Sequence, residues 1–166
     1  MLKMALDRCA IGISSRAGRR HVLMLDMDGL RLPQVENIAF RLMAKHKLSH
    51  MHILGTRDGH HVVCFDTMTW MKAKGIMCTS GEDEMHHSFL RGHAVLRISG
   101  KYGSGRMMRE PPAHIHTMVT PGNKPKGFSL AHEGIYSKLF GVPELPTSAT
   151  IKYDGALDLV RYQTGD

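Results

Sequence analysis

The sequence predicts a single α+β domain in which a central mixed or antiparallel sheet is flanked by short helices. The chain has 166 residues, which suffices for one hydrophobic core and is short for two domains. Apolar runs of strand length recur along it, with segments of helical periodicity between them. Turns rich in Gly, Pro and Asp separate these segments. We therefore expect one domain over residues 1–166, which includes a basic N-terminal arm over residues 1–20.

The expected elements follow one another along the chain. A strand at about 21–27 precedes a helix that begins at Leu32 and Pro33 and ends near Lys47. Pro33 suits the first turn of this helix, and apolar residues then recur every three or four positions. The remaining expected elements are strands at 51–54 and 61–65, a short helix at 68–74, strands at 94–99 and 114–119, a helix at 132–140, and a terminal hairpin of 150–153 with 157–162.

Composition limits the classes of function. The formal net charge is +7, which favours an anionic partner, and nucleic acid is the first candidate. The cysteines Cys9, Cys64 and Cys78 are isolated, so no Cys-X-X-Cys pair predicts a zinc ribbon or a redox motif. An odd number of isolated cysteines suits a reducing compartment, so we expect the protein in the cytoplasm. No apolar run approaches the roughly 20 residues of a membrane span, so we expect no membrane partner.

Two carboxylates follow the first predicted strand. Asp26 and Asp28 are two positions apart, so their side chains lie on one face of a strand, where like charges repel unless a cation lies between them. Carboxylate oxygens suit Mg²⁺ or Mn²⁺, which also bind phosphates. Two other interpretations remain open. Asp-X-Asp-Gly also begins haloacid-dehalogenase phosphatases, although Leu30 stands where they usually have Thr, and Asp28-Gly29 can simply be a turn.

A second motif joins the next two predicted strands. Thr56 and Arg57 begin a turn that ends at Gly59, and His60 and His61 begin the following strand. A histidine at this position can donate a hydrogen bond to a triphosphate oxygen. Adjacent residues of a strand point to opposite faces, so only one of the two histidines can join a shared site, and alternation alone does not choose between them. The alternative is a surface hairpin with exposed histidines.

A third motif lies on the strand expected at 94–99. Arg97, Ser99 and Lys101 would share one strand face if the strand continued that far. Two cations and a hydroxyl suit a phosphate group or a nucleic-acid backbone. The alternative is the exposed face of a half-buried strand.

Together these segments resemble the archaeo-eukaryotic primase superfamily, the primase-polymerases of phages, plasmids and archaea. The resemblance covers about residues 20–140, in the order strand with Asp-X-Asp, helix, strand, Thr-X-X-Gly-X-His and basic strand. It implies that Asp26 and Asp28 form the family's first metal-binding motif and that His61 is its nucleotide-phosphate histidine. The Leu96–Lys101 segment resembles the Leu-Arg-Ile-Ser-X-Lys segment of phage- and plasmid-type members.

The resemblance also implies a function. It predicts an RRM-like catalytic core and metal-dependent nucleotidyl transfer on a DNA template, in plasmid, phage or mobile-element replication. Mg²⁺ or Mn²⁺ would be the cofactor; the partners would be single-stranded DNA, nucleoside triphosphates and helicase or other replication proteins. The family normally has a third acidic metal ligand, for which Asp83 is the best candidate. The residues expected to bind nucleotide phosphates are Thr56, Arg57, His61, Arg97, Ser99 and Lys101.

Two other functions remain open from the sequence. His50-Met51-His52 and His114-Ile115-His116 have the His-hydrophobic-His pattern that binds a divalent metal in rolling-circle replication nucleases. Such an enzyme also needs a nucleophilic tyrosine on a helix, and Tyr136 lies in an expected helix. The net charge alone would also suit a non-catalytic module that binds nucleic acid.

Overall fold

The fold is built on an antiparallel sheet, which a computed structural model describes for residues 9–80, 92–98, 101–102, 108–120, 122–145 and 157–163. Its strand order is β5-β1-β2-β4-β3-β8, and β9 also pairs with β1. Every strand pair described is antiparallel, so the antiparallel form of the predicted α+β fold is confirmed. The strands are β1 (Cys9–Ala17), β2 (Arg20–Asp28), β3 (His50–Gly55), β4 (Gly59–Met68), β5 (Val95–Arg97), β8 (Ala113–Val119) and β9 (Leu157–Gln163).

The N-terminal arm is a correction to the sequence prediction. From Cys9 onward the chain enters the sheet as β1 and turns back at Gly18, which has a φ of +63°, into β2. The basic residues Arg16 and Arg19 lie at this hairpin, and Arg16 pairs with His21 across it. Only Ile11 and Ile13 alternate with small residues here, and this strand signal was too weak to outweigh the arginines. Residues 1–8 of the expected arm lie outside the described residues.

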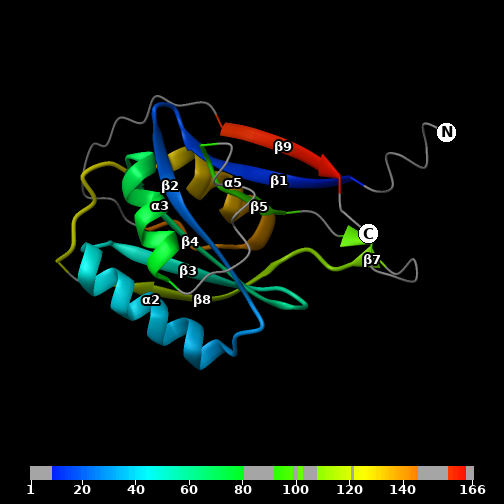
Figure 1. Ribbon diagram of the computed structural model, residues 1–166, viewed down its shortest axis with the longest axis horizontal. Coiled ribbons are helices and arrows are strands. Elements are labelled where there is room, and N and C mark those ends of the chain that lie inside the picture. Colours follow the sequence, from blue (N-terminus) through cyan, green and yellow to red (C-terminus); the bar gives the residue numbers. More distant parts are fainter. Residues whose placement is uncertain are drawn as a thin grey trace.

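Strand β1 has different partners along its length. It pairs with β2 only at Arg16 and Ala17 and with β5 at Gly12–Ser14, whereas β9 pairs with it at Cys9–Ile13 and again at Ala17. Because Ile13 is paired with both Leu96 and Leu159, β5 and β9 lie on opposite edges of β1. Strands β2 and β5 therefore share one edge of β1 and pair with different parts of it, and the two strands also contact each other. Figure 1 shows β9 and β1 side by side.

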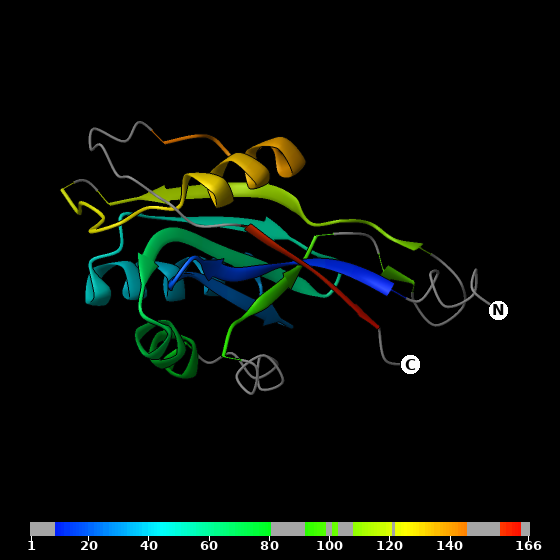
Figure 2. The same cartoon turned by 90° about the horizontal axis from the view of Figure 1, so that it is seen from above.

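Helices cover both faces of the sheet (Figure 2). Helices α2 (Leu32–His46) and α3 (Trp70–Thr79) lie on one face, and α5 (Leu130–Phe140) lies on the other. The described helices contact β2, β3 and β4, the middle of the sheet. None of these helices is both long and apolar enough to cross a membrane.

The predicted bounds of the helices hold best for α2. It begins at Leu32 with Pro33 in the first turn, and it ends where Lys47 adopts a left-handed conformation with a φ of 54°. The second predicted helix is displaced, because β4 continues to Met68 and the N-cap is Thr69, whose hydroxyl accepts from the backbone N–H of Lys72 at 3.3 Å. Gly75, expected to end this helix, lies inside it.

In the C-terminal region the predicted helix is confirmed, whereas the second strand of the predicted hairpin has another partner in the sheet. Helix α5 is capped by Ser129 and ends at Gly141, which has a φ of 68°, close to the predicted 132–140. Strand β9 covers the second strand of the expected terminal hairpin, but it pairs with β1. The first strand of that hairpin, 150–153, lies outside the described residues.

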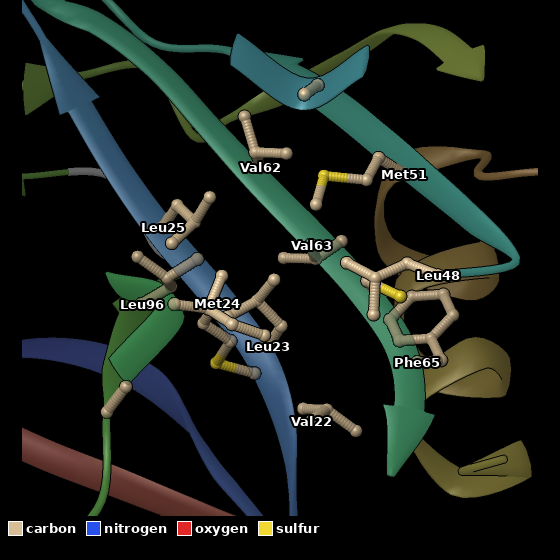
Figure 3. Close-up of a cluster of buried hydrophobic side chains, with 14 of the residues drawn as sticks. Val22, Leu23, Met24, Leu25, Leu48, Met51, Val62, Val63, Phe65 and Leu96 are labelled. Carbon is tan, nitrogen blue, oxygen red and sulfur yellow. The ribbon is translucent and has the colours of Figure 1, made fainter. Parts of the chain in front are cut away.

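The hydrophobic core lies between the sheet and its helices. Figure 3 shows part of it, where aliphatic side chains of β2 and β4 pack against Leu48, Met51 and Leu96. Burying such side chains contributes about 1.5–3 kcal/mol each, which makes this layer the main source of stability. The labelled residues from β2 and β4 are Val22, Leu23, Met24, Leu25, Val62, Val63 and Phe65.

The core on the α5 side contains several buried histidines. The rings of His50 and His52 lie 5.4 Å and 5.1 Å from that of Phe65, between β3 and α5. Both histidines are fully buried. Burial, followed by the charge of His114, lowers the pKa of His52 to about 3, and burial also lowers the pKa of His50 well below its ordinary value. Both imidazoles are therefore neutral at physiological pH.

Histidine His132 fastens α5 to β1. Its Nδ1 accepts from the Ser129 hydroxyl at 2.6 Å, and its Nε2–H donates to the Ser14 carbonyl at 2.9 Å. The side chain is fully buried, so these hydrogen bonds replace the water that the imidazole loses on folding. The helix is thereby attached to strand β1.

We predict that acid destabilises this fold through its buried histidines. His52 and His61 have folded-state pKa values of about 3, so between about pH 6.5 and pH 3 they bind protons only in the unfolded chain, and the lowered pKa of His50 acts in the same direction. Stability is full above that window and falls as the pH falls through it. His52 and His61 should each remove about 2 kcal/mol from the free energy of unfolding by about pH 5.

Urea unfolding at about pH 7.5, 6 and 5 measures this loss. The His52→Gln variant keeps an acceptor for the hydrogen bond with Thr117 but does not titrate. Its pH dependence should therefore be weaker by about the contribution of one histidine. A midpoint that stays constant over this range would contradict the prediction.

Candidate active site at the end of strands β2 and β4

The pairing of β2 with β4 brings the first two motifs together. Asp26 is the Cα partner of His61, and Asp28 is the partner of Gly59. Paired residues of antiparallel strands point to the same face, so the side chains of Asp26 and His61 are neighbours. Asp26 Oδ1 lies 3.8 Å from His61 Nε2. This separation exceeds that of a direct hydrogen bond, so the two groups lie beside each other without a short contact.

The register identifies which histidine belongs to this site. His61 faces Asp26, whereas His60 is paired with Met27 and points to the opposite face. The alternation of the sequence left this choice open, and the structure resolves it in favour of His61.

Gly59 makes this close pairing possible. A Cβ atom at Gly59 would contact the carbonyl oxygen of Met27 and the Cα of Asp28, the latter at 2.6 Å. The absence of a side chain therefore lets the two strands approach each other where Asp28 and Gly59 pair. The nearby turn is fastened to the end of β2, because the Gly29 N–H donates to the Asp58 carbonyl at 2.8 Å.

The histidine of the site is neutral. Only 6% of the His61 side chain is exposed, against 26% of the Asp26 side chain. Burial lowers the pKa of His61 to about 3, with smaller contributions from the charges of Arg97 and His60. The neutral imidazole adds no positive charge beside the carboxylates, and one ring nitrogen still carries a hydrogen that it can donate. Arg97, the last residue of β5, is the one described residue of the third predicted motif whose charge contributes to this shift.

The structure describes only some of the other predicted site residues. Asp28 is exposed at the end of β2, and Arg57 is exposed in the turn between β3 and β4. The Thr56 hydroxyl accepts from the Gly59 N–H at 3.0 Å and so helps to close that turn. Ser99 and Asp83 lie outside the described residues.

Lys101 is not on the same strand as Arg97, which corrects the prediction. Strand β5 ends at Arg97, and Lys101 belongs to β6 (Lys101–Tyr102), which pairs with β7 (Met108–Arg109) in a separate small sheet. The shared face expected for Arg97, Ser99 and Lys101 assumed an unbroken strand. Gly100 and the Gly-rich turn after it made that assumption weak.

The two carboxylates fit a divalent cation. They project from one strand face at its solvent-exposed end, where Asp26 is partly exposed and Asp28 is exposed. Oxygen ligands of this kind suit Mg²⁺ and Mn²⁺, and these ions keep several water or phosphate ligands of their own. The arrangement can therefore hold a metal ion that also binds phosphate oxygens, next to a neutral hydrogen-bond donor.

The His-hydrophobic-His pattern of β8 does not form a chelating pair. His116 is paired with Ile53 and His114 with Leu54, because a bulge lies between them. Ile53 and Leu54 are adjacent in β3 and point to opposite faces, and so do the two histidines. One metal ion cannot be bound by both.

The candidate nucleophile of a rolling-circle nuclease is also inaccessible. Tyr136 is 1% exposed, and its ring packs 5.5 Å from that of Phe65. Because the side chain is buried, its hydroxyl cannot reach a phosphodiester. Burial also raises the pKa of the hydroxyl above its ordinary value, which makes it a poorer nucleophile. The geometry therefore does not support the rolling-circle interpretation.

A second group of potential ligands lies in the core, formed by His50, Cys64 and Asp66 with ligand atoms within 4.8 Å of one another. Its polar atoms already have partners. His50 Nε2 accepts from the Phe65 N–H at 2.9 Å, so the proton of this neutral ring lies on Nδ1, 2.7 Å from the Ser49 hydroxyl oxygen. The Ser49 hydroxyl donates to Asp66 at 2.5 Å.

These contacts make the group a structural network. Both nitrogens of His50 are occupied, and Asp66 also accepts from the Ser49 backbone N–H at 2.7 Å. Burial raises the pKa of the Cys64 thiol well above its ordinary value, which disfavours the thiolate that a metal would need. The group therefore joins β3 to β4 through hydrogen bonds.

Comparisons with protein-family models, with curated proteins and with solved structures found no match.

We predict that Gly59→Ala disrupts this end of the sheet. The added methyl group would contact the backbone of Met27 and Asp28, which cannot move without changing the β2–β4 pairing. The free energy of unfolding should fall by about 1–3 kcal/mol, measured by chemical unfolding. Gly75→Ala is the matched control, because a Cβ there meets no atom within 4 Å and the residue lies inside α3. It should leave stability unchanged or raise it by up to about 1 kcal/mol. Equal effects of the two substitutions would rule out the close packing described here.

Proposed function

We propose that this protein is a metal-dependent nucleotidyltransferase of the primase-polymerase type, which extends an oligonucleotide on a DNA template. The observation that supports this most directly is the pairing of Asp26 with His61 across β2 and β4, 3.8 Å apart. Two motifs that are 35 positions apart in the sequence thereby form one group. The proposal includes a primase-polymerase catalytic core for this α+β domain.

Each residue has a proposed role. Asp26 and Asp28 would hold Mg²⁺ or Mn²⁺, which would lower the pKa of the attacking 3′-hydroxyl and stabilise the leaving pyrophosphate. Neutral His61 would donate a hydrogen bond to a phosphate oxygen of the incoming nucleoside triphosphate, and the guanidinium of Arg97 would offset phosphate charge. Thr56 would act through the turn that it closes at Gly59.

Several parts of the proposal rest on the resemblance of the sequence. Asp83 remains the proposed third carboxylate. Arg57, Ser99 and Lys101 remain proposed contacts of the nucleotide phosphates or the template. Single-stranded DNA and replication proteins such as a helicase remain the proposed partners.

We predict that the two carboxylates are required for catalysis. The variant with Asp26→Asn and Asp28→Asn keeps the shapes of both side chains and removes the charges that would hold the cation. Incorporation of labelled nucleotide in the presence of Mn²⁺ should fall by at least about a thousandfold, since metal-bound charge stabilisation is worth several kcal/mol. Primer extension on a denaturing gel measures this, and circular dichroism checks the fold.

Glu144→Gln is the control for the loss of a carboxylate, because Glu144 is exposed in the segment after α5, where the N–H of the next residue, Leu145, donates to Glu133 of that helix. It should retain full activity. Normal incorporation by the double Asp→Asn variant would refute the proposed function.

We predict that Tyr136→Phe retains activity and folds at least as stably as the original chain. The Tyr136 hydroxyl is buried and has no hydrogen-bond partner among the described residues, so its removal eliminates a desolvation cost. Unfolding midpoints and primer extension measure the two effects. A covalent adduct with single-stranded DNA that disappears in Tyr136→Phe would instead establish a rolling-circle nuclease.

A further inference from the structure

A basic cleft lies at the end of the sheet opposite the candidate active site. It has a volume of about 510 Å³ and is bordered by the end of α2, the start of α3, the start of β2, the end of β4 and the loop at 122–126. Its permanent cations are Arg20, Lys47, Lys72, Lys124 and Lys126. In Figure 1 the loop before α5 and the C-terminal end of α2 lie at the left of the molecule, away from the end of β2 that leads into α2.

The loop that carries two of the lysines is held in place at both ends. At its start, the Asn123 side-chain amide donates to the Leu48 carbonyl at 3.1 Å, and the Thr120 N–H donates to the Ser49 carbonyl at 3.0 Å. At its end, the Thr67 N–H donates to the Gly127 carbonyl at 3.0 Å. Lys124 and Lys126 are thus presented on a fixed backbone.

The arginine of the cleft is also oriented. Arg20 donates from Nε to the Thr67 hydroxyl at 3.1 Å and from Nη2 to the Thr67 carbonyl at 2.7 Å. These two contacts leave further guanidinium N–H groups for an anion. The cleft also includes Thr69, the N-cap of α3, and the N-terminus of this helix adds partial positive charge.

Little in the cleft opposes the cations. The one carboxylate among the described residues of its lining, Asp66, is 6% exposed and accepts hydrogen bonds from the N–H and the hydroxyl of Ser49. The lysines make no ion pair with another described residue, and all four are exposed. Burial, followed by the charges of Lys45 and Lys72, lowers the pKa of His46, which lines the same cleft. The cleft is therefore a concentration of unpaired positive charge.

We propose that this cleft is a second binding site, which takes phosphate groups of a nucleic-acid backbone. The anionic chemistry follows from the cleft itself, and the choice of nucleic acid rests on the proposed function. No Phe, Tyr or Trp is among the described residues that line the cleft, so they offer no ring on which a base would stack, and we expect the cleft to bind the backbone. Along β2 from Arg20 to Asp26 the distance is about 20 Å, so the two sites are separate.

The test compares two double variants with the same change of charge. In the first, Lys124→Glu and Lys126→Glu reverse the charge of the loop. In the second, Arg41→Glu and Lys138→Glu reverse exposed cations of α2 and α5 that do not line the cleft. The probe is a fluorescein-labelled oligothymidylate of about 12 nucleotides, long enough to span the distance between the two sites at about 3.4 Å per nucleotide. Fluorescence anisotropy is measured in EDTA, without nucleotide or metal.

The first variant should bind the probe at least about tenfold more weakly, and its affinity should depend less on salt. Each lost phosphate contact reduces the slope of log affinity against log salt by about 0.7 for a single strand. The second variant should change affinity by less than about threefold, with little change of slope. Unchanged affinity in the first variant, or equal losses in both, would overturn the proposal.

Competition identifies the anion that the cleft prefers. Unlabelled oligothymidylate should displace the probe, whereas orthophosphate and a nucleoside triphosphate should do so only at far higher concentration. If the triphosphate competes well and loses this ability in the first variant, the cleft is a mononucleotide site and the proposal is wrong. If polyglutamate binds more tightly than the oligonucleotide with the same dependence on Lys124 and Lys126, the partner is an acidic protein segment and the proposal is also wrong.

The result of the binding experiment does not depend on whether the chain is catalytically active. Binding in EDTA requires neither the carboxylates nor their metal, so an inactive Asp26 and Asp28 variant should bind the probe normally. If the chain catalyses incorporation, the first variant should raise the KM for template and leave the KM for nucleotide unchanged. An unchanged KM for template would separate the cleft from the reaction and overturn its role there.

Discussion

The pairing of β2 with β4 is the contact on which the other features of this molecule depend. These two strands occupy the middle of the sheet, and helices pack against both of its faces along them. Their register determines which side chains meet α5 and which meet α2 and α3, because a shift by one residue would exchange the two faces. It also determines that Asp26 meets His61. Gly59 allows this register at the crowded end, where a side chain would contact the β2 backbone.

The distribution of charge in the molecule also follows the β2–β4 pair. One end of β2 presents two carboxylates beside a neutral histidine, and the other end borders a cleft with five permanent cations. Between these ends the sheet carries buried imidazoles, which burial keeps uncharged. The net charge of +7 is thus unevenly distributed, and the number alone does not show where an anion would bind.

Patterns that depend on neighbouring residues were predictable from the sequence. The apolar strand before Asp26 and the helix from Leu32 follow from alternation and periodicity, whereas the link between Asp26 and a downstream histidine came from the resemblance to the primase family. Features that depend on distant partners were not. The bulge that separates His114 from His116 arises in the pairing of β8 with β3. The choice of His61 over His60 required the register of β4 against β2. The basic cleft is assembled from separate segments of the chain, and no local pattern marks it.

The pairing of β1 has a consequence for how the chain reaches its native state. This strand precedes its partners β5 and β9, which lie more than 80 and about 150 residues further along the sequence. Until those segments arrive, β1 can form only the short hairpin with β2. Closing such long loops is entropically costly before their contacts form, so folding of this molecule should be slow for its size. During that interval both edges of β1 lack most of their hydrogen-bond partners, and an unpaired edge is a site where a second copy can add a strand. The completed sheet covers these edges with β5 and β9. Before that point, a folding chain is protected from pairing with a second copy only by rapid folding or by a chaperone.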